Sequence, residues 1–232
     1  FDVPGASDTV ALGINSSGQI VGRFDDATGT HGFMKNGDVI TTLDVPGAVS
    51  TGPADINDAG EIVGWYKDAA GASRGFIYDG ANFDTTVAVP GAANTVATGI
   101  NSTGQIVGES YETIGSDRGF LFSNGQYTPL DAPNAKYTIA TRINDAGQIT
   151  GFFLDNADVT HGFTNSNGTY NLFDVPGAKG TFGFDINNVG ELAGYFLVLD
   201  PDDSGRLYFY RGFIDDGVSI NTLVVPVASD TF

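Results

Sequence analysis

Residues 143–151 read Ile-Asn-Asp-Ala-Gly-Gln-Ile-Thr-Gly, and this stretch decides the fold because the chain repeats it. Related copies are INSSGQIVG at 14–22, INDAGEIVG at 56–64, INSTGQIVG at 100–108 and INNVGELAG at 186–194. Their asparagines stand at positions 15, 57, 101, 144 and 187, so successive copies are 42, 44, 43 and 43 residues apart. A period in this range is typical of solenoids, arrays and propellers. The whole chain is therefore one unit repeated.

Within one period the sequence predicts four short strands. In the first repeat these are residues 9–15, 19–24, 31–35 and 39–46, which are rich in β-branched and aromatic residues. Asn-Ser-Ser-Gly follows the first strand and Asn36-Gly37 precedes the last one, and both sequences suit tight hairpin turns. Helical and leucine-rich repeats lack this pattern, and a parallel β-helix has a shorter period. Four strands joined by hairpins form an antiparallel meander, as in one propeller blade.

We therefore predict an all-β, single-domain protein over residues 1–232, a five-bladed β-propeller of four-stranded antiparallel blades with about 43 residues per repeat. The repeats span approximately 7–48, 49–92, 93–135, 136–178 and 179–232. Residues 2–9 (DVPGASDT) and 225–231 (VPVASDT) resemble each other, which indicates that the ring closes where they meet. A closed monomer is the expected form, and a domain-swapped dimer is the alternative.

Charge and composition restrict the possible partners. Ten basic residues against 28 acidic ones give a net charge of −18, which argues against nucleic acid because cation contacts dominate that affinity. No apolar run approaches the roughly 18–20 residues of a membrane span, so we expect no membrane insertion. The absence of cysteine rules out disulfides and thiolate metal sites.

A second repeated element follows each copy of the motif, a Gly-Phe pair preceded by a basic residue at His31, Arg74, Arg118, His161 and Arg211. The combination resembles the bacterial extracellular repeat family named HAF after a His-Ala-Phe triplet, although glycine replaces alanine throughout and arginine replaces histidine in three copies. The resemblance implies an extracellular or cell-surface bacterial protein and no particular activity. We expect the phenylalanines in the core, and the basic residues in structural ion pairs with the acidic loops before them.

The fourth and fifth copies differ from the others where one repeat joins the next. The candidate ligand-binding residues there are Lys136, Tyr137, Arg142, Lys179, Phe182, Phe184 and, in a longer loop, Tyr208. Cations beside aromatic rings suit a polar or carboxylated sugar through ion pairing and stacking. We predict a module that binds carbohydrate, or an extracellular protein, at the mouth of the central channel. Ordinary divergence between repeats is the competing explanation.

Two other functions stay open. A glycoside hydrolase or polysaccharide lyase could use Asp55 and Asp185 as its carboxylate pair. A purely structural surface protein would bind no small ligand. The stretch from Asp55 to Glu61 also resembles the start of a calcium loop, but the other copies do not keep its leading aspartate, so an Asx turn is favoured. We expect no metal and no cofactor, with calcium as the minority alternative.

Overall fold

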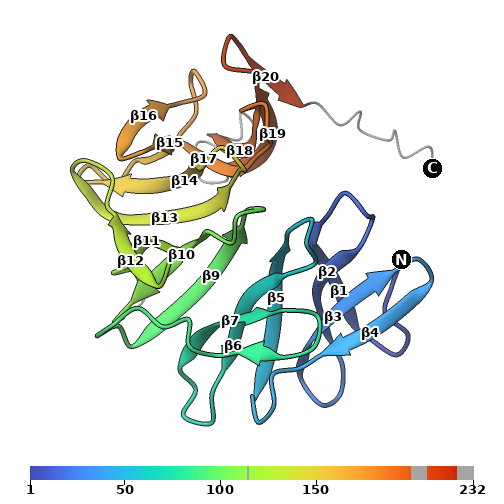
Figure 1. The fold of residues 1–232 in the computed structure, drawn as a ribbon. Helices are drawn as coiled ribbons and strands as arrows, with labels where there is room; N and C mark the ends of the chain where they lie inside the picture. The colour runs from blue at the N-terminus through green and yellow to red at the C-terminus, as the bar shows by residue number, and fades with distance from the viewer. Residues whose placement is uncertain (114, 200–207, 224–232) are drawn as a thin grey trace, which may run out of the picture.

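The computed structural model describes residues 1–113, 115–199 and 208–223, which form twenty β-strands and no helix (Figure 1). The first repeat contains β1 (Asp8–Ile14), β2 (Ile20–Asp25), β3 (Thr30–Asn36) and β4 (Val39–Leu43); the second contains β5 (Ser50–Ile56), β6 (Ile62–Lys67), β7 (Ser73–Tyr78) and β8 (Phe83–Asp84); the third contains β9 (Asn94–Ile100), β10 (Ile106–Tyr111), β11 (Arg118–Ser123) and β12 (Gln126–Leu130). The fourth contains β13 (Ala135–Ile143), β14 (Gln148–Asp155), β15 (Thr160–Ser166) and β16 (Thr169–Phe173); the fifth contains β17 (Gly180–Ile186), β18 (Leu192–Leu199), β19 (Tyr208–Asp215) and β20 (Ile220–Leu223). Within these ranges no helix is long and apolar enough to cross a membrane.

Hydrogen bonding groups the strands into three four-stranded sheets and one sheet of eight. The first, second and third repeats each form an antiparallel sheet in sequence order. A single parallel bridge between Thr160 and Gly180 joins the fourth and fifth repeats into the larger sheet. The predicted all-β fold of repeated four-stranded antiparallel sheets is confirmed. This grouping does not establish a count of five blades, and the predicted closure through residues 225–231 lies outside the described residues.

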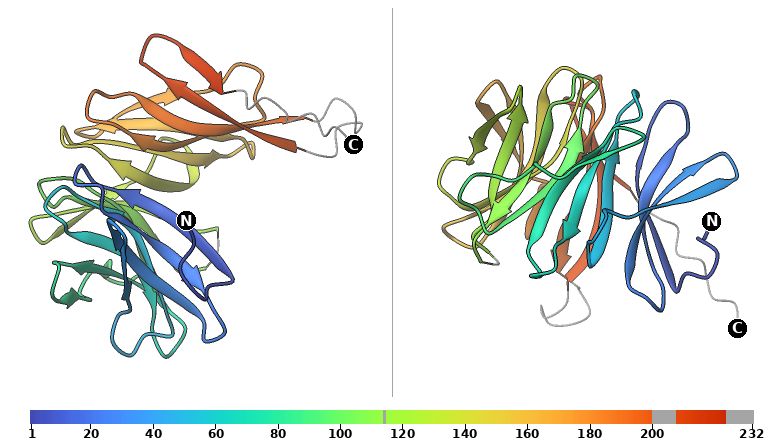
Figure 2. Two further views of the ribbon diagram at one scale, coloured as in Figure 1. Left: turned by 90° about the vertical axis from the view of Figure 1, so that its right-hand side faces the viewer. Right: turned by 60° about the horizontal axis from the view of Figure 1, so that its bottom comes forward.

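The first strand of each repeat lies innermost. Strands β1, β5, β9, β13 and β17 contact one another in that order, and the other strands of each repeat fan outward (Figures 1 and 2). The fourth strand is shorter than the sequence predicts, because β4 ends at Leu43 and the chain turns at Pro46-Gly47, where Gly47 has φ of 80°. That turn carries the chain from the outer edge of one sheet to the centre of the next.

The repeated phenylalanine and the last glycine of the motif fit together in the core. The phenylalanines Phe33, Phe76, Phe120, Phe163 and Phe213 are at most 2% exposed, as the pattern predicts. Each ring packs over the glycine of the neighbouring second strand. A Cβ added at Gly108, for example, would lie 2.0 Å from the Val96 carbonyl oxygen and 2.9 Å from the Phe120 ring. The motif therefore ends in glycine because the phenylalanine and the inner strand occupy the space of a side chain.

Contacts between successive repeats use the first isoleucine of the motif. In the second repeat Ile56 is 4% exposed and packs in one cluster with Val21 of the first repeat. The corresponding Ile100, Ile143 and Ile186 are 5–7% exposed. Burying such a side chain contributes about 1.5–3 kcal/mol, so these isoleucines are a main source of cohesion between sheets.

Candidate binding site on the axis

Every inner strand carries one extra residue where it approaches the centre. Near the centre, the pairing of each first strand with its second skips one position, and the skipped residues are Leu12, Ala54, Thr98, Thr141 and Phe184. Strand β13 skips a second position, Lys136, at its other end. A bulge of this kind leaves one residue outside the ladder, so its carbonyl group needs another donor. The bulges therefore place backbone oxygens without ladder partners around the axis.

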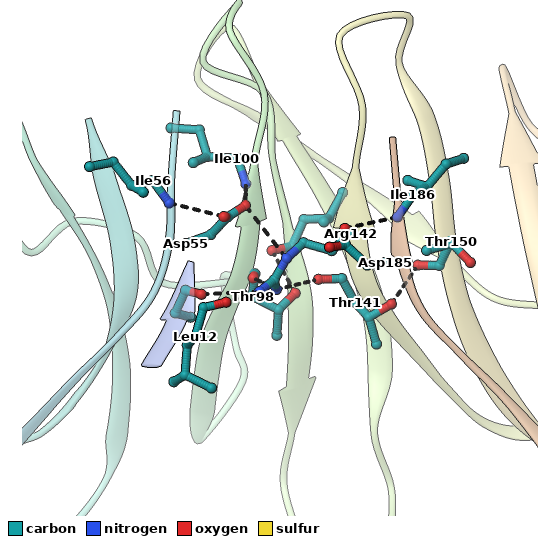
Figure 3. A network of polar contacts seen from close by, with 12 residues as sticks. Leu12, Asp55, Ile56, Thr98, Ile100, Thr141, Arg142, Thr150, Asp185 and Ile186 are labelled. Atoms are coloured by element: carbon teal, nitrogen blue, oxygen red, sulfur yellow. Dashed lines mark hydrogen bonds and ion pairs between the residues drawn. The ribbon is translucent and has the colours of Figure 1, made fainter. Parts of the chain in front are cut away.

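Arg142 on β13 supplies the missing donors. Its Nη2 donates to the carbonyl oxygens of Leu12 at 3.0 Å and Ala54 at 3.1 Å, on the first and second repeats. Its Nη1 donates to Thr141 at 3.0 Å and also to Thr98 on the third repeat (Figure 3). One guanidinium thus binds four of the five bulge carbonyls, and it holds the inner strands of four repeats around a common point.

Two carboxylates stand at the same repeat position as this arginine. Asp55 Oδ2 lies 3.8 Å from Arg142 Nε, and both side chains are only 13% exposed. The backbone amides of Ile56 and Ile100 donate to Asp55 at 2.9 and 3.0 Å. Burial raises the pKa of Asp55, and the charge of Arg142 opposes that rise. Asp185 accepts the amide of Ile186 at 2.8 Å and is exposed, so it meets solvent while Asp55 is locked in place.

The asparagines of the motif form a second ring beside the axis. Each side chain accepts the backbone amide four residues later and donates to the Gln or Glu there, as Asn101 does with Gln105. Its amide also donates to the next repeat: the donors Asn15, Asn57, Asn101 and Asn144 reach the backbone oxygens of Asn57, Asn101, Asn144 and Asn187 at 3.0–3.2 Å. The motif therefore joins neighbouring repeats as well as closing its own turn.

These segments enclose a pocket of about 530 Å³. Its wall is formed by the Ile-Asn pairs of the second to fifth repeats and by Ile14 of the first, and Asp55, Arg142 and Asp185 line it. Asp145 adds a rim carboxylate whose pKa is lowered by the hydrogen bond from the Ser102 amide. The volume falls within the range of about 300–1,000 Å³ typical of small-ligand sites. The pocket thus combines apolar walls with fixed acidic and amide groups.

The predicted ligand-binding residues do not form one cluster. Lys136 lies six positions before Arg142 on the same strand, and an extended chain separates such positions by about 20 Å. Lys136 is paired with Asp158, and Tyr137 lies near Thr160, with a pKa raised by burial and by Asp117. Of the set, Arg142 lines the axial pocket, whereas Lys136 and Tyr137 lie at the opposite end of β13 and the exposed Lys179 directly precedes β17.

The aromatic residues of the fifth repeat form a separate surface. Phe182 stacks on Tyr195 with ring centroids 4.6 Å apart, and Phe152 of the fourth repeat meets Phe182 at 5.0 Å. Phe184 and Tyr210 extend the surface, with 48% and 73% exposure. Tyr208 is the first residue of β19, but its side chain lies outside the described part of the chain.

Three of the basic residues before the Gly-Phe pairs, His31, Arg118 and His161, form an ion pair with an aspartate that follows in the chain, whereas Arg74 pairs with Asp68 of the preceding loop. His31 contacts Asp26 of the loop before it at 3.4 Å and the later Asp44 at 2.8 Å. Arg118 pairs with the corresponding later aspartate, Asp131, at 3.0 Å. The hydrogen bond to Asp44 raises the pKa of His31. These residues tie the outer strands to the link between repeats, which leaves them no evident part in a ligand site.

The described residues contain no group of three or more His, Asp or Glu side chains arranged to hold a metal ion. In the calcium-like stretch, Asn57 Oδ1 accepts the amides of Ala59 and Glu61 at 3.1 and 2.9 Å, which is the Asx-turn arrangement. Asp55 and Asn57 therefore direct their oxygens toward backbone amides.

Sequence comparison identifies no relative, because no protein-family model and no curated protein matches the chain. Solved structures do resemble it. A protein from Agrobacterium tumefaciens that is provisionally described as TolB matches 92% of this chain and 79% of its own, with 13% identity and a TM-score of 0.66. A fucose-recognising lectin from Aleuria aurantia, described as a six-bladed β-propeller, matches 96% of this chain and 80% of its own, with 14% identity and a TM-score of 0.55. At this identity the likeness establishes the propeller fold alone.

Proposed function

We propose that the protein is a carbohydrate-binding β-propeller whose ligand enters the axial pocket. The observation that carries the proposal is the pocket of about 530 Å³, in which backbone and carboxamide groups are held by the asparagine ring while Asp185 faces solvent. A sugar presents hydroxyl groups that donate and accept together with apolar ring faces, and this wall offers both kinds of partner.

The charge of the site defines the class of sugar. Asp55, Asp145 and Asp185 give the pocket more carboxylates than the single cation Arg142 can balance, and the whole chain carries a net charge of −18. Like charges across a binding surface are unfavourable, so the ligand is a neutral or amino sugar rather than a uronic acid. The similarity to a fucose-recognising lectin supports a neutral sugar through fold analogy alone.

The biological setting belongs to the same proposal. We infer that the fourth and fifth repeats are separate blades, so that the chain supplies five, and that the protein is a monomer of the HAF type acting outside a bacterial cell. The single bridge between Thr160 and Gly180 supports this division, because all other pairing in the eight-stranded sheet stays within one repeat. The strongly acidic chain without cysteine is consistent with that setting.

The test is retention of the protein on a panel of immobilised neutral, amino and uronic oligosaccharides. We expect saturable binding to neutral or amino sugars. Because Asp185 and Asn188 both line the pocket, Asp185→Ala with Asn188→Ala should weaken it about tenfold or more, since each hydrogen bond contributes about 1 kcal/mol. Lys136→Ala with Lys179→Ala is the matched control, because these exposed cations lie away from the pocket. Loss of binding in the control with retention in the pocket variant would move the site to the other ends of the strands.

A glycosidase using the same pocket is the second candidate. Asp55 favours it, because a carboxyl group whose pKa is raised by burial is suited to act as a general acid. Asp185 would then be the partner carboxylate. The measurement is the appearance of new reducing ends in the same panel, with Asp55→Asn and Asp185→Asn alongside. Cleavage that survives both substitutions excludes this pair.

A further inference from the structure

The first and fifth repeats lack a neighbour on one side. Ile14 of the first repeat is 65% exposed, whereas its four counterparts are 4–7% exposed beneath the preceding repeat. Figure 1 shows the blue strands of the first repeat and the orange strands of the fifth at the two ends of the array. We use the word opening for the position between the exposed faces of these two repeats. Within the described residues the inner strands β17 and β1 do not pack together as the other consecutive inner strands do.

The fifth repeat shows the complementary exposure. Val21, Val63, Val107 and Thr150 are fully buried beneath the following repeat, but the corresponding Ala193 is exposed. The same side of the sheet carries Ile214 at 40%, Phe184 at 48% and Tyr210 at 73% exposure. Aromatic and aliphatic side chains gathered on one exposed face are typical of the centre of a protein interface.

The asparagine ring also ends at these two faces. Asn144 donates to the Asn187 carbonyl, but the Asn187 amide has only Glu191 as an acceptor among the described residues. At the other end, no preceding asparagine in the described chain donates to the Asn15 carbonyl oxygen. Among the described residues, the Asn187 amide thus lacks the second acceptor that its counterparts have, and the Asn15 carbonyl accepts only the Gly18 amide of its own turn at 3.0 Å.

We propose that this opening is a docking site for one further blade of the same repeat, donated by a partner polypeptide. Such a blade would place its isoleucine over Ala193 and its aliphatic face over Ile14. Its own asparagine turn would accept from Asn187 and donate to Asn15. The interface would continue the contact that already occurs four times between successive repeats of this chain.

The likeness to a six-bladed structure gives the size of the opening. This chain aligns over 96% of its length with only 80% of that lectin, which is close to five blades in six. The part of the six-bladed lectin that this chain leaves unmatched is therefore about the length of one blade. A second complete copy of this chain is too large for the opening, whereas a single four-stranded blade matches it.

The test uses the full chain joined through a cleavable flexible linker to an additional copy of residues 44–86, which carry the link and strands of the second repeat. Because the protein has no cysteine, a single Ala193→Cys substitution reports on the face without background. We expect the added blade to slow labelling of that thiol about tenfold or more, since a buried site reacts only after local opening. After linker cleavage, the blade should stay bound during gel filtration.

The matched control is the same fusion with aspartate replacing isoleucine and alanine replacing asparagine in the Ile-Asn pair of the added copy. The proposal would be overturned if the control blade protected the thiol at position 193 and stayed bound in gel filtration as well as the unmodified blade does. Release of the unmodified blade after linker cleavage would also overturn it. A second variant, Ile14→Cys with Ala193→Cys, tests direct closure. Rapid formation of an intramolecular disulfide would show that the first and fifth repeats pack on each other and leave no docking site, because a disulfide requires Cα atoms within about 7 Å.

Discussion

Replacing Arg142 with methionine should destabilise the whole array, because this one side chain serves four repeats. The substitution removes the hydrogen bonds to the Leu12 and Ala54 carbonyls and leaves Asp55 without its cation. Removing one partner of a buried ion pair costs about 3–5 kcal/mol. We expect the lower end, about 3 kcal/mol, since the axial pocket lets water reach some of the freed groups.

The assay is urea unfolding followed by fluorescence of Trp65, the single tryptophan of the chain. Arg142→Met should lower the free energy of unfolding, and adding Asp55→Asn should recover at least about 1 kcal/mol by removing the orphaned charge. The pH dependence should have a definite sign. Without the arginine the pKa of Asp55 rises further, so the stability of the single variant is highest at acidic pH and falls as the pH increases.

Either of two results would refute this reasoning. A loss below about 1 kcal/mol would mean that water replaces the guanidinium without cost. Additive effects of Arg142→Met and Asp55→Asn would mean that the two side chains do not interact across their separation of 3.8 Å. Arg142→Lys is a useful companion, because it keeps the charge but cannot reach several carbonyls with one planar group.

Three further predictions test contacts between repeats and within one repeat. Asn101→Ala should cost about 1 kcal/mol more than Asn187→Ala in denaturant unfolding, because only Asn101 binds a following repeat; equal losses would limit the asparagines to their own turns. Burial raises the pKa of Glu109 from 4.5 to about 7, so its charged form opposes folding and the stability is lost as the pH rises through that window. Glu109→Gln should therefore raise the free energy of unfolding by up to about 3 kcal/mol at pH 8 and leave it unchanged near pH 4, and an equal effect at both pH values would contradict the assigned cause. Gly108→Ala should lower the melting temperature sharply and cost at least about 3 kcal/mol, since its Cβ would lie 2.0 Å from the Val96 carbonyl oxygen; a near-native melting curve would show that the inner strand can shift aside.

Local signals in the sequence predicted the strands and turns well. The hairpin glycines adopt positive φ, as at Gly104 with 74° and Gly147 with 76°, and the buried phenylalanines recur in every repeat. The sequence predicts that the asparagine of the motif is a turn residue, and in the structure this side chain also bonds to the next repeat. The Gln or Glu four residues after each asparagine binds it within the same turn, so one repeat carries no signal for the bond to the next repeat.

The axial site was harder to predict, because it depends on the bulges. Arg142, Asp55 and Asp185 occupy one repeat position, and opposite charges in a single column suggest contact across a centre. The sequence prediction groups Arg142 with Lys136 because they are close in sequence. This grouping is wrong, since the extended strand β13 places the two side chains far apart and only Arg142 belongs to the column at the axis. Two features depend on how the five repeats curve around the axis, which no single repeat encodes. They are the direction of the bulge carbonyls and the exposed faces at Ile14 and Ala193.

Arg142 already binds four of the five bulge carbonyls at the axis, and this limits how the number of repeats in such a chain can change. Duplicating the second or third repeat would add an aspartate or a glycine to the column, as at Asp55 and Gly99. Duplicating the fourth would bring a second cation beside Arg142, where like charges repel. The repeats are therefore not equivalent, although their sequences are similar. The charge of Arg142 at the axis restricts the chain to one copy of the fourth repeat.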